Sequence, residues 1–170
     1  MHGNQRQTDW AYIAGVMDSD GCFMITRHKR KYKGKEISPC FLPCTKISQV
    51  EPETVEYITN ELGLGSYKLD RARIRQYENG QRFGSRPMYD WFIRDRKVLI
   101  PFLENTIPYL KIKKDRAKHL LSYCRTIQGN PGRGKIPKEV LDYREEAYLK
   151  MRKFNCNKVA ATTNSPSTER

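Results

Sequence analysis

The first hydrophobic run of the chain has the spacing of a helix. Its large apolar side chains recur at Trp10, Ile13, Val16 and Met17. Thr8 or Asp9 is a suitable N-cap, and Gly21 is a residue type at which helices commonly stop. The pattern therefore predicts a helix that begins at residue 8 or 9 and ends near Ser19.

After the first helix, apolar and polar residues alternate with the two-residue period of a strand. Residues 22–50 predict two strands joined by a basic turn at residues 33–35, because apolar and polar positions alternate in the first strand. Phe23 and Ile25 are the positions expected to face inward. This region is therefore predicted to form an antiparallel hairpin.

A helix and a second hairpin are predicted next. Residues 52–65 predict a helix with Pro52 near its start and Gly63 at its end, which is the usual placement of these two residue types. Residues 66–77 and 86–94 predict two further strands, because the stretch between them is rich in turn-forming residues.

Three helices are predicted in the C-terminal half: residues 95–107, 113–128 and 138–155. In the first of these, Pro101 implies either a break or a helix that begins there. Residues 158–170 have the composition of a disordered tail, so residues 1–157 are predicted to form one domain. The order of the elements predicts an α+β fold with antiparallel hairpins.

The charge of the chain indicates a polyanionic partner. Lys and Arg number 32 against 19 Asp and Glu, which gives a formal net charge of +13. No apolar run approaches the ~20 residues of a membrane span, and neither end carries a lipidation motif. These features favour nucleic acid over a membrane surface, although a basic domain without such a partner remains an alternative.

The cysteines and the N-terminus indicate a reducing compartment inside the cell. There are five cysteines, an odd number, and the opening residues form neither a secretory signal nor an import sequence. The compartment itself stays unspecified. Cys40 and Cys44 are the one close pair, and without a second pair or suitably spaced histidines they do not favour a zinc site.

Two further motifs fail in their context. Residues 129–135, GNPGRGK, have the spacing of a phosphate-binding loop, but Ile136 stands where Ser or Thr would hold Mg²⁺ and a helix precedes the loop. A calcium loop with Gly21 at its sixth position would need carboxylates where Val16 and Arg27 stand. The sequence therefore predicts no nucleotide cofactor and no EF-hand.

Two carboxylates at the end of the first helix indicate a positive partner nearby. A helix C-terminus disfavours a carboxylate by about 0.3–1 kcal/mol, yet Asp18 and Asp20 both lie there. Asp20 could hold a divalent cation together with the backbone carbonyl of Ser19. Small residues on one face of the helix let two helix backbones approach closely, which indicates a tightly packed core helix.

Residues 13–21, IAGVMDSDG, resemble the LAGLIDADG motif of homing endonucleases. The positions that match this motif are Ala14, Gly15, Asp18, Asp20 and Gly21, while Ser19 replaces a small Ala. The order of helices and hairpins also fits the family. Residues 108–117, PYLKIKKDRA, resemble a downstream family segment that carries a basic residue of the active site. The resemblance covers about residues 8–128.

This resemblance implies an αββαββα core whose saddle-shaped antiparallel sheet lies in the DNA major groove, with additional C-terminal helices. It implies a homodimer of the single-motif kind, in which two copies pack through Ala11, Ala14, Gly15 and Asp18. The implied activity is Mg²⁺-dependent, site-specific cleavage of double-stranded DNA at a long, near-palindromic target, in the homing of an intron or intein. An RNA-binding intron maturase and a non-cleaving DNA-binding regulator are the alternatives.

The resemblance also implies the roles of individual residues. Asp20 would bind the metal with the Ser19 carbonyl, and Gln49 would position the attacking water. Lys113 would stabilise charge or help to order solvent near the cut. One departure is that Glu51 and Glu53 occupy a stretch where some relatives carry a basic residue.

Contacts with DNA are expected from polar positions on both hairpins. In the first hairpin these are Met24, Thr26, His28, Arg30, Lys31, Lys33, Lys46 and Ser48; in the second they are Lys68, Arg71, Arg73 and Arg75. Arginine side chains suit the O6 and N7 atoms of guanine, and the lysines of the basic turn suit phosphates. A charged face that contacts only solvent is the alternative for each.

Overall fold

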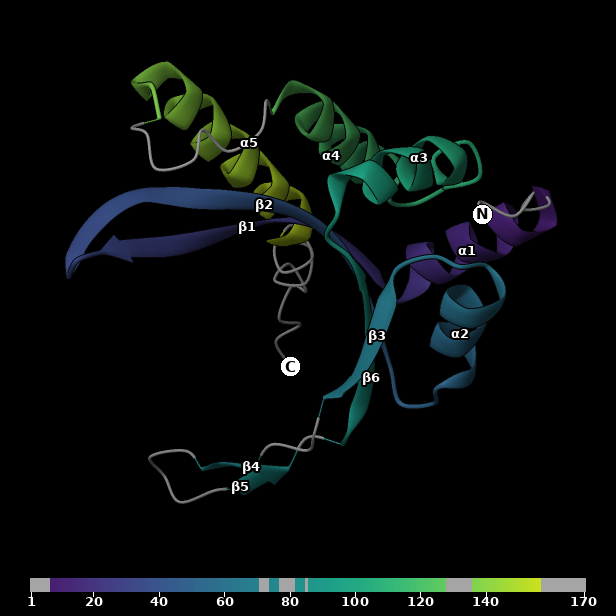
Figure 1. Cartoon of the computed structure of the whole chain (residues 1–170). Helices are drawn as coiled ribbons and strands as arrows, with labels where there is room; N and C mark the ends of the chain where they lie inside the picture. The colour runs from purple at the N-terminus through teal and green to yellow at the C-terminus, as the bar shows by residue number, and fades with distance from the viewer. Residues whose placement is uncertain (1–6, 71–73, 77–81, 85, 128–135, 157–170) are drawn as a thin grey trace, which may run out of the picture. The chain divides into compact units, whose positions relative to one another are not determined.

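The computed structural model of the chain describes residues 7–70, 74–76, 82–84, 86–127 and 136–156 (Figure 1). The chain forms two compact units. The first contains residues 1–23 and 43–128, and the second contains residues 24–42 and 129–170. Within the described residues, no helix is long and apolar enough to cross a membrane.

The elements follow the predicted order. They are α1 (Gln7–Ser19), β1 (Gly21–Tyr32), β2 (Lys35–Gln49), α2 (Glu53–Glu56), the π-helix η1 (Tyr57–Glu61), β3 (Ser66–Asp70), β4 (Ile74–Gln76), β5 (Arg82–Gly84), β6 (Met88–Ile93), α3 (Arg96–Thr106), α4 (Lys114–Thr126) and α5 (Lys138–Cys156). This arrangement of helices and antiparallel strands confirms the predicted α+β fold class.

The main sheet has four strands in the order β1-β2-β6-β3, and β4 pairs with β5 separately. Thr45 pairs with Ile93 and Ile47 with Trp91, while Lys46 pairs with Phe92 and Ser48 with Asp90. Because neighbouring residues of a strand face opposite sides, the register separates an apolar face from a polar one. The polar face continues onto β3, where Lys68 pairs with Asp90.

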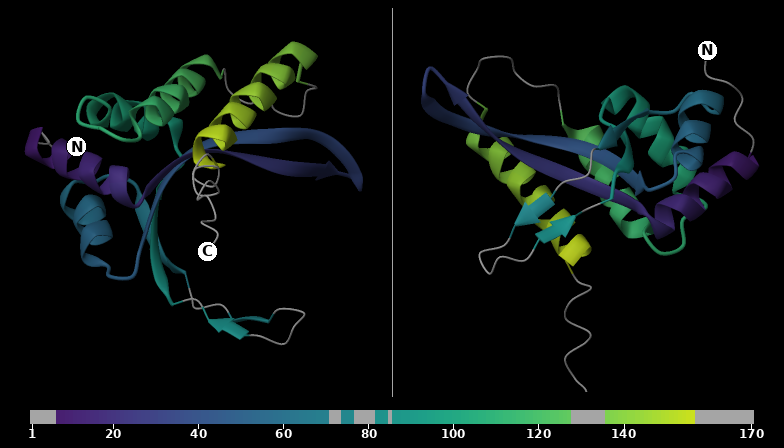
Figure 2. Two further views of the ribbon diagram at one scale, coloured as in Figure 1. Left: turned by 180° about the vertical axis from the view of Figure 1, so that it is seen from behind. Right: turned by 90° about the horizontal axis from the view of Figure 1, so that it is seen from below.

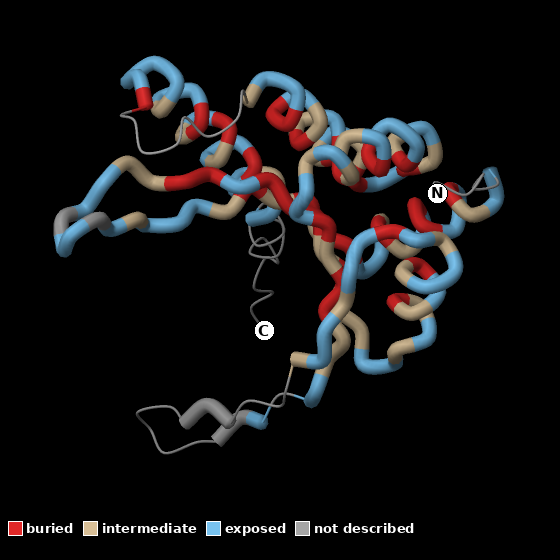
Figure 3. The backbone as a smooth tube through the Cα atoms, in the orientation of Figure 1, coloured by how far each residue is buried: buried red, intermediate tan, exposed pale blue. Residues whose placement is uncertain are grey.

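The core of the first unit forms where the apolar face of the sheet meets α1 and α3. The Trp91 ring lies 5.7 Å from the Phe102 ring of α3, which in turn lies 6.2 Å from the Trp10 ring of α1. Trp91 donates its indole N–H to the Leu64 carbonyl at 2.8 Å, so its polar atom is satisfied inside the core. Figure 2 shows α1 beside α3 from behind, and Figure 3 shows buried segments on both.

In the second unit, a tight turn joins β1 to β2 and α5 packs on the hairpin. Lys33 and Gly34 both have positive φ values, of 49° and 78°, which the two-residue turn between twisted strands requires. The Phe41 ring lies 5.9 Å from the Tyr148 ring of α5. Outside this apolar contact, Arg27 of β1 forms an ion pair with Glu145 at 3.4 Å.

The inward positions of the first strand are confirmed. Phe23 is fully buried and Ile25 is 4% exposed. The helix predicted over residues 52–65 is shorter, because four α-helical residues are followed by a π-helical turn that ends at Glu61. The strands of the second hairpin are also divided, because β4 and β5 form a separate pair beyond β3 and β6.

The prediction that Pro101 breaks or begins a helix is wrong. Pro101 lies inside α3, which is capped by Asp95 and extends to Thr106. The proline lacks the N–H that would bond the Lys97 carbonyl. Both residues are exposed, so water can satisfy that carbonyl and the helix continues.

Two glycines before β3 provide a test of this packing. Both Gly63 and Gly65 have positive φ, but a Cβ at Gly63 would meet nothing within 4 Å, whereas one at Gly65 would lie 2.8 Å from the Trp91 ring. We expect Gly63→Ala to destabilise the fold by about 1 kcal/mol, from backbone strain alone. Gly65→Ala adds overpacking, for a total of about 3 kcal/mol.

Urea denaturation of the two variants measures the difference. Equal losses of unfolding free energy would contradict the close approach of Gly65 to Trp91.

Candidate active site at the end of helix α1

The end of α1 is held by a carboxylate that accepts backbone hydrogen bonds. Asp18 receives the amide N–H groups of Lys111 at 2.7 Å, Ile112 at 3.2 Å and Lys113 at 2.8 Å. Partial burial raises the pKa of Asp18, but these three donors and the charge of Lys113 lower it by more, so its pKa lies below the ordinary value. Asp18 is therefore an ionised anchor for the loop that precedes α4.

The positive partner that the sequence required is Lys113. Its ammonium donates to the carbonyl oxygens of Met17 at 3.0 Å, Ser19 at 3.0 Å and Gly21 at 2.7 Å, and the residue is only 7% exposed. These carbonyls lie where α1 ends, so the charge of Lys113 offsets the negative end of the helix dipole.

The hydrogen bonds of Lys113 give it a structural role that the sequence analysis did not predict. An ammonium has three N–H donors, and the three carbonyls use all of them. In the structure Lys113 thus supports the backbone on both sides of Asp20, and its role near a cleaved phosphate stays a prediction. Gly21 is required there, since a Cβ would lie 2.6 Å from the Met17 Cα.

Asp20 lies immediately after α1 and is exposed. Its Oδ2 accepts from the side-chain amide of Gln49 at 3.3 Å and from the hydroxyl of Ser19 at 3.2 Å. The Ser19 hydroxyl also lies 3.1 Å from the Val16 carbonyl. The structure therefore brings together two residues predicted to act in catalysis, Asp20 and Gln49, from α1 and the end of β2.

The oxygen donors at this site fit a divalent cation only in part. Among the described residues there is no group of three or more His, Cys, Asp or Glu side chains that could hold a metal. Asp18 is committed to backbone amides, and the Ser19 carbonyl accepts from Lys113. Asp20 is thus the available carboxylate, and one carboxylate with waters and phosphate oxygens is a set that Mg²⁺ accepts.

The exposed face of α1 differs from the predicted one. Ala11 and Gly15 are exposed as expected, but Ala14 is 1% exposed and Asp18 binds the loop at residue 111. Ala14 is covered because α1 packs on the core through that side, which a helical repeat alone does not show. Tyr12 replaces it on the exposed face, at 44% exposure.

The polar face of the sheet carries a buried carboxylate that the sequence analysis missed. Asp90 of β6 is 6% exposed and accepts from the Lys46 ammonium and the Ser48 hydroxyl, each at 2.7 Å. Burial raises the pKa of Asp90, but these two hydrogen bonds and the charges of Lys46 and Lys68 lower it by more. Alternation along β6 could have placed Asp90 on this face, but not its partners.

The remaining residues predicted to contact DNA divide between described and undescribed positions. In the second unit, Lys31 and Lys33 are exposed and Met24 and Arg30 half-buried. Thr26 donates to the Leu42 carbonyl at 3.2 Å, and its hydroxyl lies 3.0 Å from His28 Nε2. Three positions lie outside what the structure describes: Arg71, Arg73 and the side chain of Arg75.

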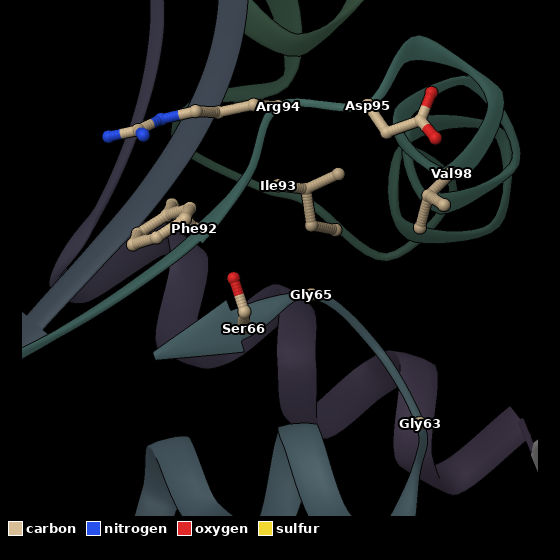
Figure 4. A pocket seen from close by; sticks show the side chains of 8 residues that line it. All are labelled: Gly63, Gly65, Ser66, Phe92, Ile93, Arg94, Asp95 and Val98. Atoms are coloured by element: carbon tan, nitrogen blue, oxygen red, sulfur yellow. The ribbon is translucent and has the colours of Figure 1, made fainter. Parts of the chain in front are cut away.

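A cavity of about 300 Å³ lies between the start of β3 and the start of α3 (Figure 4). Two of its polar side chains already serve the fold. Asp95 caps α3 by accepting from the Lys97 amide at 2.9 Å, and the Arg94 guanidinium lies 4.2 Å from the centre of the Phe92 ring. The cavity is therefore a weaker candidate for chemistry than the exposed Asp20.

Comparison with known proteins shows which solved structures share this fold. No family model and no curated protein matches the sequence. The structure is similar to that of the homing endonuclease I-TnaI, with 18% identity over 87% of this chain and 88% of that one, and a TM-score of 0.55. For I-CvuI in complex with its target in the presence of calcium, identity is 19% over 86% and 96% of the two chains, with a TM-score of 0.54.

A third structure, I-SmaMI bound to uncleaveable DNA, matches with 15% identity and a TM-score of 0.55 over 88% of this chain and 45% of that one. At these identities the likeness concerns the fold. The chain has the α+β fold of the LAGLIDADG homing endonucleases, as the motif at residues 13–21 predicts.

The lowered pKa of Asp18 predicts acid sensitivity. A carboxyl whose folded pKa lies below its unfolded value of about 3.8 stabilises the fold above that value, and the stabilisation is lost as the pH falls through the folded pKa. Asp18→Asn removes this contribution and leaves backbone donors poorly satisfied, at a cost of about 1–2 kcal/mol at pH 7.

Unfolding free energy measured from pH 7 to pH 2 checks this. The variant should lose less stability than the wild type between about pH 5 and pH 2, whereas Asp142→Asn, at an exposed position of α5, should follow the wild-type curve. A wild-type slope in Asp18→Asn would contradict the assignment.

Proposed function

We propose that the protein is a site-specific, divalent-metal-dependent DNA endonuclease of the homing type. The observation that carries this proposal is Asp20, an exposed carboxylate at the end of a helix. It accepts a hydrogen bond from Gln49, and Lys113 binds the backbone carbonyls on both sides of it. An acid in this unfavourable place has no fold contact comparable to those of Asp18. Its placement suits metal-assisted cleavage of a phosphodiester bond.

The chain's own residues would divide the work as follows. Asp20 would hold Mg²⁺ through its carboxylate, and the ion when bound would neutralise the phosphate and activate water. Gln49 uses one amide N–H on Asp20, so its carbonyl oxygen and its second N–H remain to orient a water. Lys113 fixes the carbonyls on either side of Asp20 and so holds the carboxylate in place.

The polar face of β2, β6 and β3 is the surface proposed to contact DNA. Lys46, Ser48 and Lys68 come together on it in the first unit. The net charge of +13 supports a polyanionic partner, and the structurally similar I-SmaMI is bound to DNA. Side chains of this kind can donate to and accept from the base edges in a major groove.

We further propose that two copies of the chain assemble about α1. Ala11, Tyr12 and Gly15 form an exposed face with little side-chain bulk at Gly15, and Ile112, next to the end of the helix, is 75% exposed. One chain supplies a single available carboxylate, and a second copy would supply another. The match to I-SmaMI covers 88% of this chain and only 45% of that one, so that protein is long enough for a second unit of this size.

Asp20→Asn is predicted to abolish cleavage and preserve binding. The substitution keeps the shape of the side chain and its hydrogen-bonding oxygen, but removes the charge that holds the ion. We expect cleavage to fall by at least about 10²-fold, while affinity for DNA stays within about threefold and thermal stability is retained. A target is first selected by binding from duplexes with two-fold-symmetric random half-sites.

Gel-shift titration and timed cleavage on that duplex, with Mg²⁺ and then Ca²⁺, measure the two effects. Glu51→Gln, an exposed acid just after β2, makes the same charge change and should cleave normally. Cleavage by Asp20→Asn at the wild-type rate would place the active site elsewhere.

Gly15→Leu is predicted to prevent dimer assembly while leaving the single chain folded. A Cβ at Gly15 meets nothing within 4 Å, so the single chain can accept a larger side chain there, and replacing a mid-helix glycine favours α1 by about 1 kcal/mol. The added bulk would hold two α1 helices apart. Sedimentation velocity should show a monomer with an unchanged or higher melting temperature, whereas Ser122→Leu on exposed α4 should remain dimeric.

A monomeric wild type, with and without DNA, would overturn the proposed assembly.

A further inference from the structure

Both oxygens of the buried carboxylate on the polar face are used by the neighbouring strand. Asp90 Oδ2 accepts from the Lys46 ammonium and Oδ1 accepts from the Ser48 hydroxyl, each at 2.7 Å. The side chain of Asp90 is 9% exposed and that of Lys46 is 36% exposed. The carboxylate is therefore less exposed than the Lys46 side chain, and Ser48 is half-buried.

This arrangement determines what each of the two side chains can offer to a ligand. A hydroxyl has one proton, and Ser48 gives that proton to Asp90, so its oxygen can only accept a further hydrogen bond. Lys46 has no acceptor, and two of its three N–H donors remain after the bond to Asp90. One surface position is thus an acceptor and its neighbour is a donor.

We propose that Asp90 is a specificity-determining residue that sets these directions for base recognition. Ser48, as an acceptor, selects a base with an exocyclic amino group in the major groove, which is cytosine N4 or adenine N6. Lys46, as a donor, selects the O6 and N7 atoms of guanine. The inference rests on the proposed function, because it requires that this face contact DNA.

Asp90→Asn makes the inference testable because it reverses the hydrogen bond between residue 90 and Ser48 and keeps the direction of the one from Lys46. The amide oxygen must face the Lys46 ammonium, since the opposite orientation would bring two donors together. The amide N–H₂ then donates to the Ser48 oxygen and releases the hydroxyl proton. Ser48 becomes a donor, so its preferred base changes from cytosine or adenine to one that presents an acceptor, guanine O6 or thymine O4.

The experiment selects bound duplexes from a fully random library and sequences them, for the wild type, Asp90→Asn, Ser48→Ala and the double variant. We expect one position in each half-site to prefer C or A about fivefold in the wild type, the ratio that one hydrogen bond supplies. In Asp90→Asn the same position should prefer G or T. Both Ser48→Ala proteins should show no preference there.

A matched control separates base recognition from charge. Glu104→Gln removes one negative charge from α3, where Glu104 pairs with Arg125 at 2.7 Å, and should raise overall affinity no more than slightly without changing any base preference. Thermal unfolding of every variant checks that it is folded. The preference reversal is a readout that a purely structural role for Asp90 would not produce.

The outcomes distinguish this inference from the function on which it rests. A wild type that enriches no sequence from the library would contradict sequence-specific DNA binding itself. Enrichment by the wild type with an identical base profile in folded Asp90→Asn would overturn the role of Asp90 and leave the endonuclease proposal intact. A changed profile in Asp90→Asn that persists in the double variant would show that Ser48 is not the reader.

Discussion

The exchange of hydrogen bonds between Asp18 and Lys113 is the interaction on which the candidate site depends. Asp18 accepts from three backbone amides of residues 111–113, and Lys113 donates to three backbone carbonyls at the end of α1. Segments more than ninety positions apart in the chain thereby satisfy each other's unpaired polar groups. In both sets of hydrogen bonds one partner is a charged side chain and the other is a backbone group, and such charge-assisted hydrogen bonds are strong.

This junction explains why two neighbouring acids behave differently. Asp18 accepts hydrogen bonds from the backbone amides of the loop and is committed to them. Asp20, two positions later and beyond the helix, is exposed beside Gln49. The Lys113 ammonium fixes the carbonyls that flank Asp20. The backbone on both sides of the available carboxylate is therefore held in place, as the proposed cation-binding role of Asp20 requires.

The same principle operates on the polar face of the sheet. Asp90 accepts two short hydrogen bonds from β2, and its charge is compensated by Lys46 with Lys68 nearby. A negative group inside a basic surface would weaken binding to a polyanion if it had no other role. Here it fixes the direction of one hydrogen bond from each of two side chains. Under the proposed function this would trade general affinity for selectivity.

The sequence by itself determined the α+β order of elements, the inward positions Phe23 and Ile25, and the importance of the acidic end of α1, because periodicity, helix electrostatics and charge are local properties. It could not show that Ala14 faces the core, that Lys113 binds carbonyls, or that Asp90 joins Lys46 and Ser48. Each of these depends on which distant segment lies opposite, and only the packed structure decides that.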